Sequence, residues 1–273
     1  MMDKRKVIYY DDELRDEFSL TQITPRRVDG EYVYCYDSLF KKFTHVFWYR
    51  VIFTPIAFFY TKIKFCHKVV GREKFKEHRK NGYFMYGNHT QDIGDAFMPN
   101  MMNIPKTNYF IVHPNNISMP FLGRINPSLG ALPLPDDMAA YRNFLAAVER
   151  RIKEGNCVVI YPEAHIWPYY TGIRGFADDS FYYPVKYNTP VYCFTNTYQK
   201  RRISKKPRII TYIDGPFYPD ESLPPRAQKK ELRDRVYECM RERAKRSDVV
   251  QIEYIKRSEK GEKNTESADG IRK

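Results

Sequence analysis

Residues 83–95 read Tyr-Phe-Met-Tyr-Gly-Asn-His-Thr-Gln-Asp-Ile-Gly-Asp, and this stretch indicates the fold of the chain. Its first four residues are large and mainly apolar, which is typical of a strand that is buried on both faces. Gly87 and Asn88 end the strand, and His89 follows directly. Functional side chains gather beyond the carboxyl ends of such strands, so His89 is a candidate for chemistry.

Similar short apolar runs recur downstream of this strand and alternate with helical patterns. A helix is predicted over residues 137–154 from its apolar face, with Asp136 or Asp137 as the cap, and another over about residues 226–246. The further strands are predicted at residues 108–113, 157–161, 191–195 and 209–213. This alternation predicts an α/β fold with a largely parallel sheet flanked by helices.

His89 lies close to two carboxylates, Asp92 and Asp95. A histidine can take a proton from a hydroxyl near neutral pH, and a neighbouring carboxylate orients the ring and stabilises the imidazolium. The pairing alone equally fits a histidine with a structural role. The sequence has no G-x-S-x-G element, so it offers little support for a hydrolase with an acyl-enzyme intermediate.

An ordered series of short motifs, spread over residues 38–246, resembles that of PlsC-like glycerolipid acyltransferases. The motifs are Asn88-His89 with Asp95, Met119-Pro-Phe-Leu-Gly-Arg124 with Leu129-Gly-Ala-Leu-Pro-Leu134, Tyr161-Pro162-Glu163, Arg174-Gly175 and Thr189-Pro190-Val191. Each motif is modest alone, whereas the ordered set is fairly specific.

The resemblance implies a membrane-associated O-acyltransferase that works without a covalent enzyme intermediate. Its acyl donor would be acyl-CoA or an acidic acyl-carrier protein, and its acceptor a lysophospholipid, with lysophosphatidic acid converted to phosphatidic acid. His89 would be the general base. Glu163, Arg124 and Arg174 would bind the acceptor. The resemblance implies no cofactor besides the acyl donor, and no metal.

The first departure from the family pattern concerns the carboxylate partner of His89. The family has H-x4-D, but position 94 is glycine here, and Asp95 comes one residue later. Either a local bulge at Gly94 restores the usual geometry for Asp95, or Asp92 takes the role. We favour Asp95, because Ala96 and Phe97 continue like the helix of the family motif.

Two further departures concern the acceptor site. The family's P-E-G-T is Pro162-Glu163-Ala164-His165 here, which keeps the carboxylate and loses the glycine. Pro135-Asp136 stands where the family usually has an arginine for phosphate, so phosphate recognition is weakened unless Arg124 or Arg174 substitutes. An acceptor with a different headgroup is therefore the alternative reading of the same chemistry.

The charge of the chain is concentrated ahead of these motifs. The net charge is +13, and residues 38–80 carry 11 basic and 2 acidic side chains. The same stretch holds the aromatic segment 43–61, in which Arg50 and Pro55 argue against a membrane-spanning helix of about 20 apolar residues. A helix or helical hairpin in the membrane interface fits better, and an ordinary buried helix is the alternative.

These patterns divide the chain into four parts. They are a polar N-terminal extension (1–37), basic aromatic membrane-docking helices (38–80), an acyltransferase domain (81–248) and a charged, disordered tail (249–273). The acid-rich start does not resemble a signal peptide. The five cysteines show no C-x-x-C spacing, which predicts no zinc site and favours a reducing compartment. We therefore expect a peripheral protein on the cytoplasmic face of a membrane.

A basic nucleic-acid-binding protein is the alternative from another class, because 23 tyrosines accompany the cations. Most aromatic residues, however, lie in the predicted buried strands or in segment 43–61. The chain matches no common RNA- or DNA-binding signature. The cationic cluster at residues 200–208 can meet lipid phosphates or an acidic carrier protein, or simply be solvated. We expect membrane lipids, and not nucleic acid, as partners.

Overall fold

The computed structural model describes residues 6–18 and 23–257. A seven-stranded sheet with the order β2-β8-β7-β3-β6-β4-β5 forms its centre. Its strands are β2 (Lys68–Val70), β3 (Tyr83–Gly87), β4 (Asn108–Val112), β5 (Ala131–Pro133), β6 (Cys157–Ile160), β7 (Val191–Gln199) and β8 (Arg208–Phe217). Neighbouring strands run parallel except β7 and β8, which form an antiparallel hairpin.

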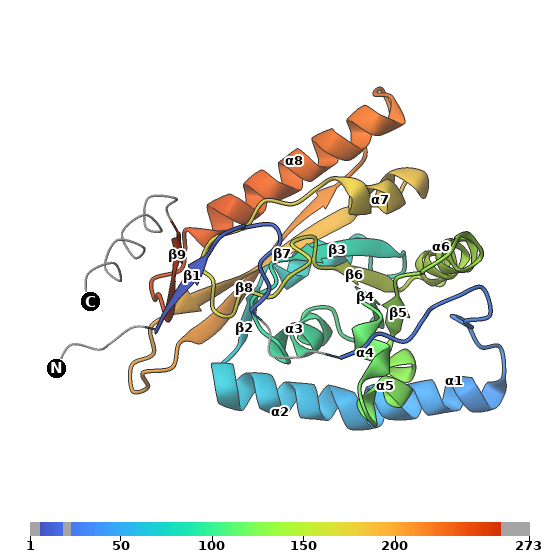
Figure 1. Cartoon of the computed structure of the whole chain (residues 1–273), viewed down its shortest axis with the longest axis horizontal. Helices are drawn as coiled ribbons and strands as arrows, with labels where there is room; N and C mark the ends of the chain where they lie inside the picture. Colours follow the sequence, from blue (N-terminus) through green and yellow to red (C-terminus); the bar gives the residue numbers. More distant parts are fainter. Residues whose placement is uncertain (1–5, 19–22, 258–273) are drawn as a thin grey trace, which may run out of the picture.

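Helices cover both faces of this sheet (Figure 1). One face carries α6 (Met138–Lys153), α7 (Tyr182–Lys186) and α8 (Pro225–Ala244). On the other side lie α1 (Leu39–Val46), α2 (Thr54–Phe65), α3 (Gly94–Phe97), α4 (Asn115–Ser118) and α5 (Leu122–Ile125). The two long predicted helices are present as α6, whose cap Asp137 accepts the Ala140 N–H at 2.8 Å, and α8.

The side chains of β3 alternate between two buried cores. Phe84 and Tyr86 pack with residues of α6 and α8, whereas Tyr83 and Met85 pack with residues of α2 and its neighbours. All four side chains are fully buried. The predicted α/β fold with a largely parallel sheet is confirmed, because a strand with apolar residues on both faces needs a helical layer on each side.

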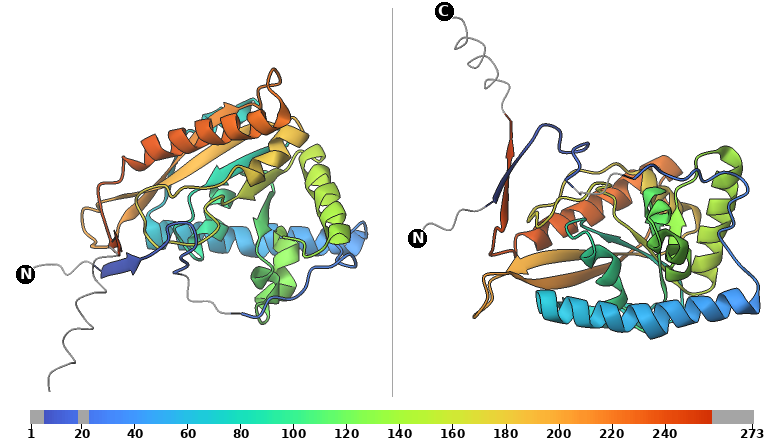
Figure 2. Two further views of the ribbon diagram at one scale, coloured as in Figure 1. Left: turned by 45° about the horizontal axis from the view of Figure 1, so that its top comes forward. Right: turned by 60° about the horizontal axis from the view of Figure 1, so that its bottom comes forward.

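The basic aromatic segment is one continuous helix along the edge of the molecule (Figure 2). A π-helical stretch, Phe47–Phe53, joins α1 to α2, and Pro55 is the second residue of α2, directly after that stretch. Of the two predicted forms, the structure therefore has the single helix and not the hairpin. No helix within residues 6–18 and 23–257 is both long and apolar enough to cross a membrane.

A second, two-stranded sheet joins the two ends of the described chain. Strand β1 (Lys6–Tyr10) pairs in parallel with β9 (Ile252–Lys256), with Lys6 opposite Ile252. The prediction of a disordered tail over residues 249–273 is therefore wrong for residues 252–256, whose alternating pattern finds a partner only in the distant N-terminal extension. Residues 258–273 of that predicted tail lie outside the described residues.

Candidate active site

His89 lies in the loop after β3, and its side chain is 18% exposed. Its Nδ1 is 2.8 Å from Oδ2 of Asp95, a carboxylate with almost no exposed surface. Asp92, the other candidate partner, is exposed to solvent. The structure thus brings Asp95 to His89 despite the extra residue between them.

Gly94 makes room for this longer loop. It is the first residue of α3, and a Cβ at this position would come within 2.8 Å of the Gln91 Cβ. The loop closes through the Asp95 N–H, which donates to the Gln91 carbonyl at 3.0 Å. Glycine is therefore needed here for space, because the turn between Gln91 and Asp95 is too tight for a side chain.

The hydrogen bonds of Asp95 determine which nitrogen of His89 carries the proton. Oδ2 of Asp95 also accepts the backbone N–H groups of Thr90 and Gln91, both at 2.8 Å. A carboxylate oxygen that accepts these bonds leaves Nδ1 of His89 as the donor. The lone pair of Nε2 is then available to accept a proton from a substrate.

Burial raises the pKa of Asp95, and the hydrogen bond from His89 opposes this effect. Tyr161 adds a fixed wall on one side of the dyad, because its ring stacks on that of His89 with centroids 4.4 Å apart and planes 17° apart. The Tyr161 hydroxyl donates to the Asp95 carbonyl at 2.5 Å. The imidazole is thus oriented both through its edge and through its face.

Glu163 and Arg174, predicted to bind the acceptor, form a buried ion pair beside the dyad. Oε2 of Glu163 is 3.2 Å from Nη2 of Arg174, and neither side chain is exposed. The same Oε2 accepts the His89 backbone N–H at 3.3 Å, and Oε1 accepts the Arg174 backbone N–H at 3.2 Å. Burial raises the pKa of Glu163, which the positive charge of Arg174 opposes. In this structure the pair supports the loop of His89 and has no open surface for a ligand.

The N-terminal extension covers this ion pair, which sequence reasoning did not anticipate. The Arg174 guanidinium donates to the carbonyls of His165 and Glu13 and lies over the Trp167 ring. The Trp167 indole N–H donates to the Asp16 carbonyl at 2.8 Å. The strand-like patterns of residues 6–10 and 252–256 were the only signal in the sequence for this arrangement. The patterns alone do not show that the N-terminal segment covers the ion pair.

Arg124, the third predicted acceptor-binding residue, lies on α5 and is exposed. Within the described residues its side chain forms no hydrogen bond or ion pair. It is thus free to meet a ligand, whereas Arg174 is already paired.

Strand β7 supports the loop of His89 from behind, through residues that sequence reasoning also missed. The Asn88 side chain bonds both the N–H and the carbonyl of Asn196, at 2.8 and 3.1 Å. The Tyr198 hydroxyl donates to Thr90 Oγ1 at 2.7 Å and accepts from Gln91 at 3.0 Å. Asn196 and Tyr198 follow the apolar run 191–194 on a strand that is buried as far as Tyr198, and polar groups on a buried strand were the signal for their role.

The described residues contain one cluster with the geometry of a metal site, formed by Cys193, Asp214 and Cys239. Asp214 is already paired with Lys74 at 2.6 Å and with Arg243 at 2.6 Å. These two cations neutralise the carboxylate, so the cluster is a poor cation site. The absence of metal and cofactor stays a prediction from the sequence.

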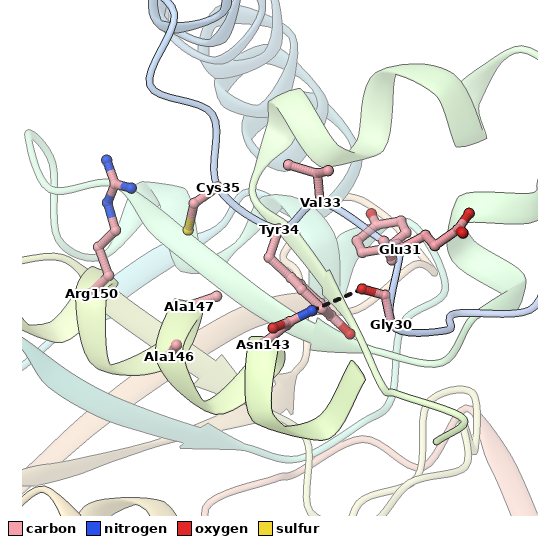
Figure 3. Close-up of a pocket in the computed structure, with 10 residues that line it drawn as sticks. Gly30, Glu31, Val33, Tyr34, Cys35, Asn143, Ala146, Ala147 and Arg150 are labelled. Atoms are coloured by element: carbon pink, nitrogen blue, oxygen red, sulfur yellow. Dashed lines mark hydrogen bonds between the residues drawn. The ribbon is translucent and has the colours of Figure 1, made fainter. Parts of the chain in front are cut away.

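A groove of about 360 Å³ lies between residues 30–35 and α6 (Figure 3). Its lining includes Tyr34, Cys35 and Asn143, whose amide donates to the Gly30 carbonyl at 3.0 Å. It contains none of the residues around His89.

Comparison with known proteins agrees with this geometry. Residues 66–195 match the family model named Acyltransferase. The search of curated proteins finds no match. The crystal structure of the 1-acyl-sn-glycerophosphate (LPA) acyltransferase PlsC from Thermotoga maritima has a similar fold, with a TM-score of 0.51 and 18% identity over 77% of this chain and 81% of that chain. Residues 66–195 thus carry an acyltransferase domain, and the fold of the chain is similar to that of a PlsC protein.

Proposed function

We propose that the protein transfers a fatty acyl group from acyl-CoA or acyl-carrier protein to a hydroxyl of a lysophospholipid, with lysophosphatidic acid as the first candidate acceptor. The observation that carries the proposal is the pairing of His89 Nδ1 with the buried Asp95, which leaves Nε2 as the proton acceptor of a side chain that is 18% exposed.

The reaction follows from this arrangement. Nε2 of His89 takes the proton of the acceptor hydroxyl, while the oxygen of that hydroxyl attacks the carbonyl carbon of the thioester. The tetrahedral intermediate collapses, the C–S bond breaks, and the thiolate leaves with the electron pair. A thiol has a pKa of about 8.5–9, so the imidazolium can return its proton to the sulfur. The products are an ester and a free thiol, and Asp95 stabilises the positive imidazole between the two proton transfers.

A lipid acceptor without a terminal phosphate is the second candidate. It is favoured by the burial of Arg174, whose guanidinium is already paired with Glu163, and by the departures at Pro135-Asp136 and Ala164-His165. Arg124 is the exposed cation of the three predicted acceptor residues and supports the phosphate-bearing acceptor instead.

We further propose that the helix of residues 39–65 docks on the cytoplasmic face of an anionic membrane. Support comes from its exposed apolar side chains, which include Leu39, Phe40, Phe43, Phe47, Val51, Phe59 and Ile63. Such a surface is unusual on a soluble monomer and fits the membrane interface. The five free cysteines fit a reducing compartment.

The β7–β8 hairpin extends this docking surface. Figures 1 and 2 show the hairpin beside the C-terminal end of α2, where the Arg201 guanidinium donates to the Lys64 carbonyl. Its tip carries Lys200, Arg202, Lys205 and Lys206 around Ile203, which is 97% exposed. Cations beside an exposed apolar residue suit a surface of anionic headgroups.

An acyl-transfer assay with a panel of acceptors tests the catalytic proposal. Purified protein is incubated with labelled acyl-CoA or acyl-carrier protein and with lysophosphatidic acid, lysophosphatidylcholine, lysophosphatidylglycerol or monoacylglycerol. We expect a diacyl product from at least one acceptor and none with His89→Ala. Product from His89→Ala at the wild-type rate would contradict the role of His89, and phosphate-free acceptors used best would select the second candidate.

A further inference from the structure

A line of buried hydrogen bonds runs from the catalytic carboxylate to a second histidine. Nδ2 of Asn196 faces Oδ1 of Asp95 at 3.5 Å, the long end of the hydrogen-bond range. Oδ1 of Asn196 accepts from Thr211 Oγ1 at 2.6 Å, and Thr211 Oγ1 lies 2.8 Å from Nε2 of His67. The four side chains form a continuous chain from the dyad into the sheet.

The sheet topology accounts for this alignment. The strands β2, β8, β7 and β3 are neighbours in that order. His67 directly precedes β2, Thr211 and Asn196 lie opposite each other in the β7–β8 ladder, and the loop of Asp95 follows β3. The line thus crosses four adjacent strands, and it ends next to α2, where the Lys62 ammonium donates to the His67 carbonyl at 2.7 Å.

Every bond in the line points in one direction. The Thr211 hydroxyl gives its single proton to Asn196, so its oxygen must accept from His67. His67 therefore carries a proton on Nε2. Burial, together with Lys62 and Arg72, lowers its pKa to about 3, so the ring is neutral near pH 7. His67, Thr211, Asn196 and Asp95 are all at most 2% exposed, so water does not compete for these bonds.

We propose that Asn196, Thr211 and His67 are positioning residues that orient an N–H donor toward Asp95 and thereby set the basicity of His89. The inference rests on the His89–Asp95 dyad of the proposed function. Thr211 holds the amide oxygen of Asn196, so its amide N–H must face the carboxylate, and His67 orients the Thr211 hydroxyl. The hydrogen bond between Asn196 and Asp95 is long. The hydrogen bond from Thr211 is therefore needed to keep the Asn196 amide from rotating away from Asp95.

Removing this support changes the proton affinity of the dyad in a definite direction. A donor near a buried carboxylate favours its ionised form. Without the donor, the dyad binds a proton more readily, and the inactive protonated form persists to higher pH. The other groups that face the dyad are Glu163, which is neutralised by Arg174, and the hydroxyls of Tyr161 and Tyr198.

The test is a histidine titration by NMR on full-length protein labelled with 15N at the imidazoles. The histidine signals are assigned with His67→Gln and His89→Gln. Thr211→Val should raise the pKa of His89 by about half a pH unit, while Thr211→Ser should restore the wild-type value. Thr195→Val is the matched control, because Thr195 Oγ1 is buried on the same strand as Asn196 and has no hydrogen-bond partner among the described residues.

A second pair of variants covers the case that Thr211→Val does not fold. His67→Gln keeps an N–H near the position of Nε2 and should leave the titration of His89 near that of the wild type. His67→Leu removes the donor and should raise the pKa of His89, as Thr211→Val does. Unchanged titration of His89 in both Thr211→Val and His67→Leu would overturn the proposal, as would an equal shift in Thr195→Val.

This readout separates the inference from the proposed function, because it needs no turnover. In an active enzyme, the acidic limb of kcat/KM should move upward with the titration, and KM should change by less than about twofold. A wild-type protein that acylates none of the acceptors would refute the proposed function, while the NMR titration would still decide the role of the positioning residues.

Discussion

His89 and Asp95 are joined by a 2.8 Å hydrogen bond although five residues, rather than four, separate them. The extra residue is absorbed in a turn that closes between Gln91 and Asp95 and that leaves no room for a Cβ at Gly94. The dyad of the family motif is thus kept with a different loop, and the relationship can be tested directly.

Replacement of Asp95 should disable the enzyme. Asp95→Asn keeps an oxygen for the neighbouring N–H groups but cannot stabilise the imidazolium by charge, so we expect kcat to fall by about 10²–10⁴-fold. Asp92→Asn, at an exposed position in the same loop, is the control and should stay within about twofold. Steady-state kinetics of the two variants give the answer, and the reverse order of effects would assign Asp92 as the partner.

Gly94→Ala should lower activity through geometry alone. The added Cβ would meet the Gln91 Cβ at 2.8 Å, which requires the loop to shift and moves Asp95 away from His89. We expect kcat to fall at least about tenfold, since small displacements of catalytic groups are costly. Gly175→Ala is the control, because its nearest neighbour would lie at an ordinary 3.6 Å. Full activity of Gly94→Ala would show that the loop tolerates the methyl group.

Breaking the buried ion pair should destabilise the fold. Glu163→Ala leaves the guanidinium of Arg174 buried without its carboxylate, which costs about 3–5 kcal/mol of unfolding free energy. Urea unfolding at neutral pH measures this loss. Glu238→Ala removes one partner of the exposed pair with Arg241 and should change stability little. Equal losses in the two variants would mean that burial does not determine the strength of the pair.

The stability of the protein should fall as the pH drops below about 6.5. His67 has its pKa lowered to about 3 in the folded state, so between these values the unfolded chain binds a proton that the folded chain does not. One such group contributes at most about 1.4 kcal/mol per pH unit. His45, whose pKa is also lowered by burial, acts in the same direction. Urea unfolding between pH 7 and pH 5 should show a shallower decline for His67→Gln than for the wild type.

Membrane binding should depend on the exposed aromatic residues of α1 and its junction with α2. Replacing Phe40, Phe43 and Phe47 together by Ser removes apolar area from the docking face, and we expect liposome affinity to fall at least about tenfold. Met138→Ser, at an exposed apolar position on α6, is the control. Sedimentation with anionic and neutral liposomes reads out both variants, and unchanged binding of the triple variant would place the docking surface elsewhere.

The local patterns of the sequence were sufficient for the sheet and for the candidate base. Residues 83–86 are apolar in succession, and such a run is stable only between two helical layers, so the α/β class follows from the strand itself. His89 follows that strand directly, so it was a candidate base from the local sequence alone. That Glu163, after the end of β6, lies beside it depended on the parallel pairing of β3 with β6.

Other features depend on partners far apart in the chain. Strands β1 and β9 pair across more than 240 residues, and the pattern of each short strand does not show which distant strand it pairs with. The burial of Arg174 follows from the N-terminal segment that covers it, so a residue that the motif series offers as a ligand contact becomes a support for the loop of His89.

The α/β class, the candidate base His89 and the cationic aromatic helix were thus readable from periodicity, motif order and local charge, which are properties of short segments. Which carboxylate meets His89, which arginine stays accessible and which side chains stand behind Asp95 depended on how distant segments pack. Hydrogen bonds and burial are set by the three-dimensional neighbours of each group, and these become definite only when strands β2, β8, β7 and β3 come to lie side by side.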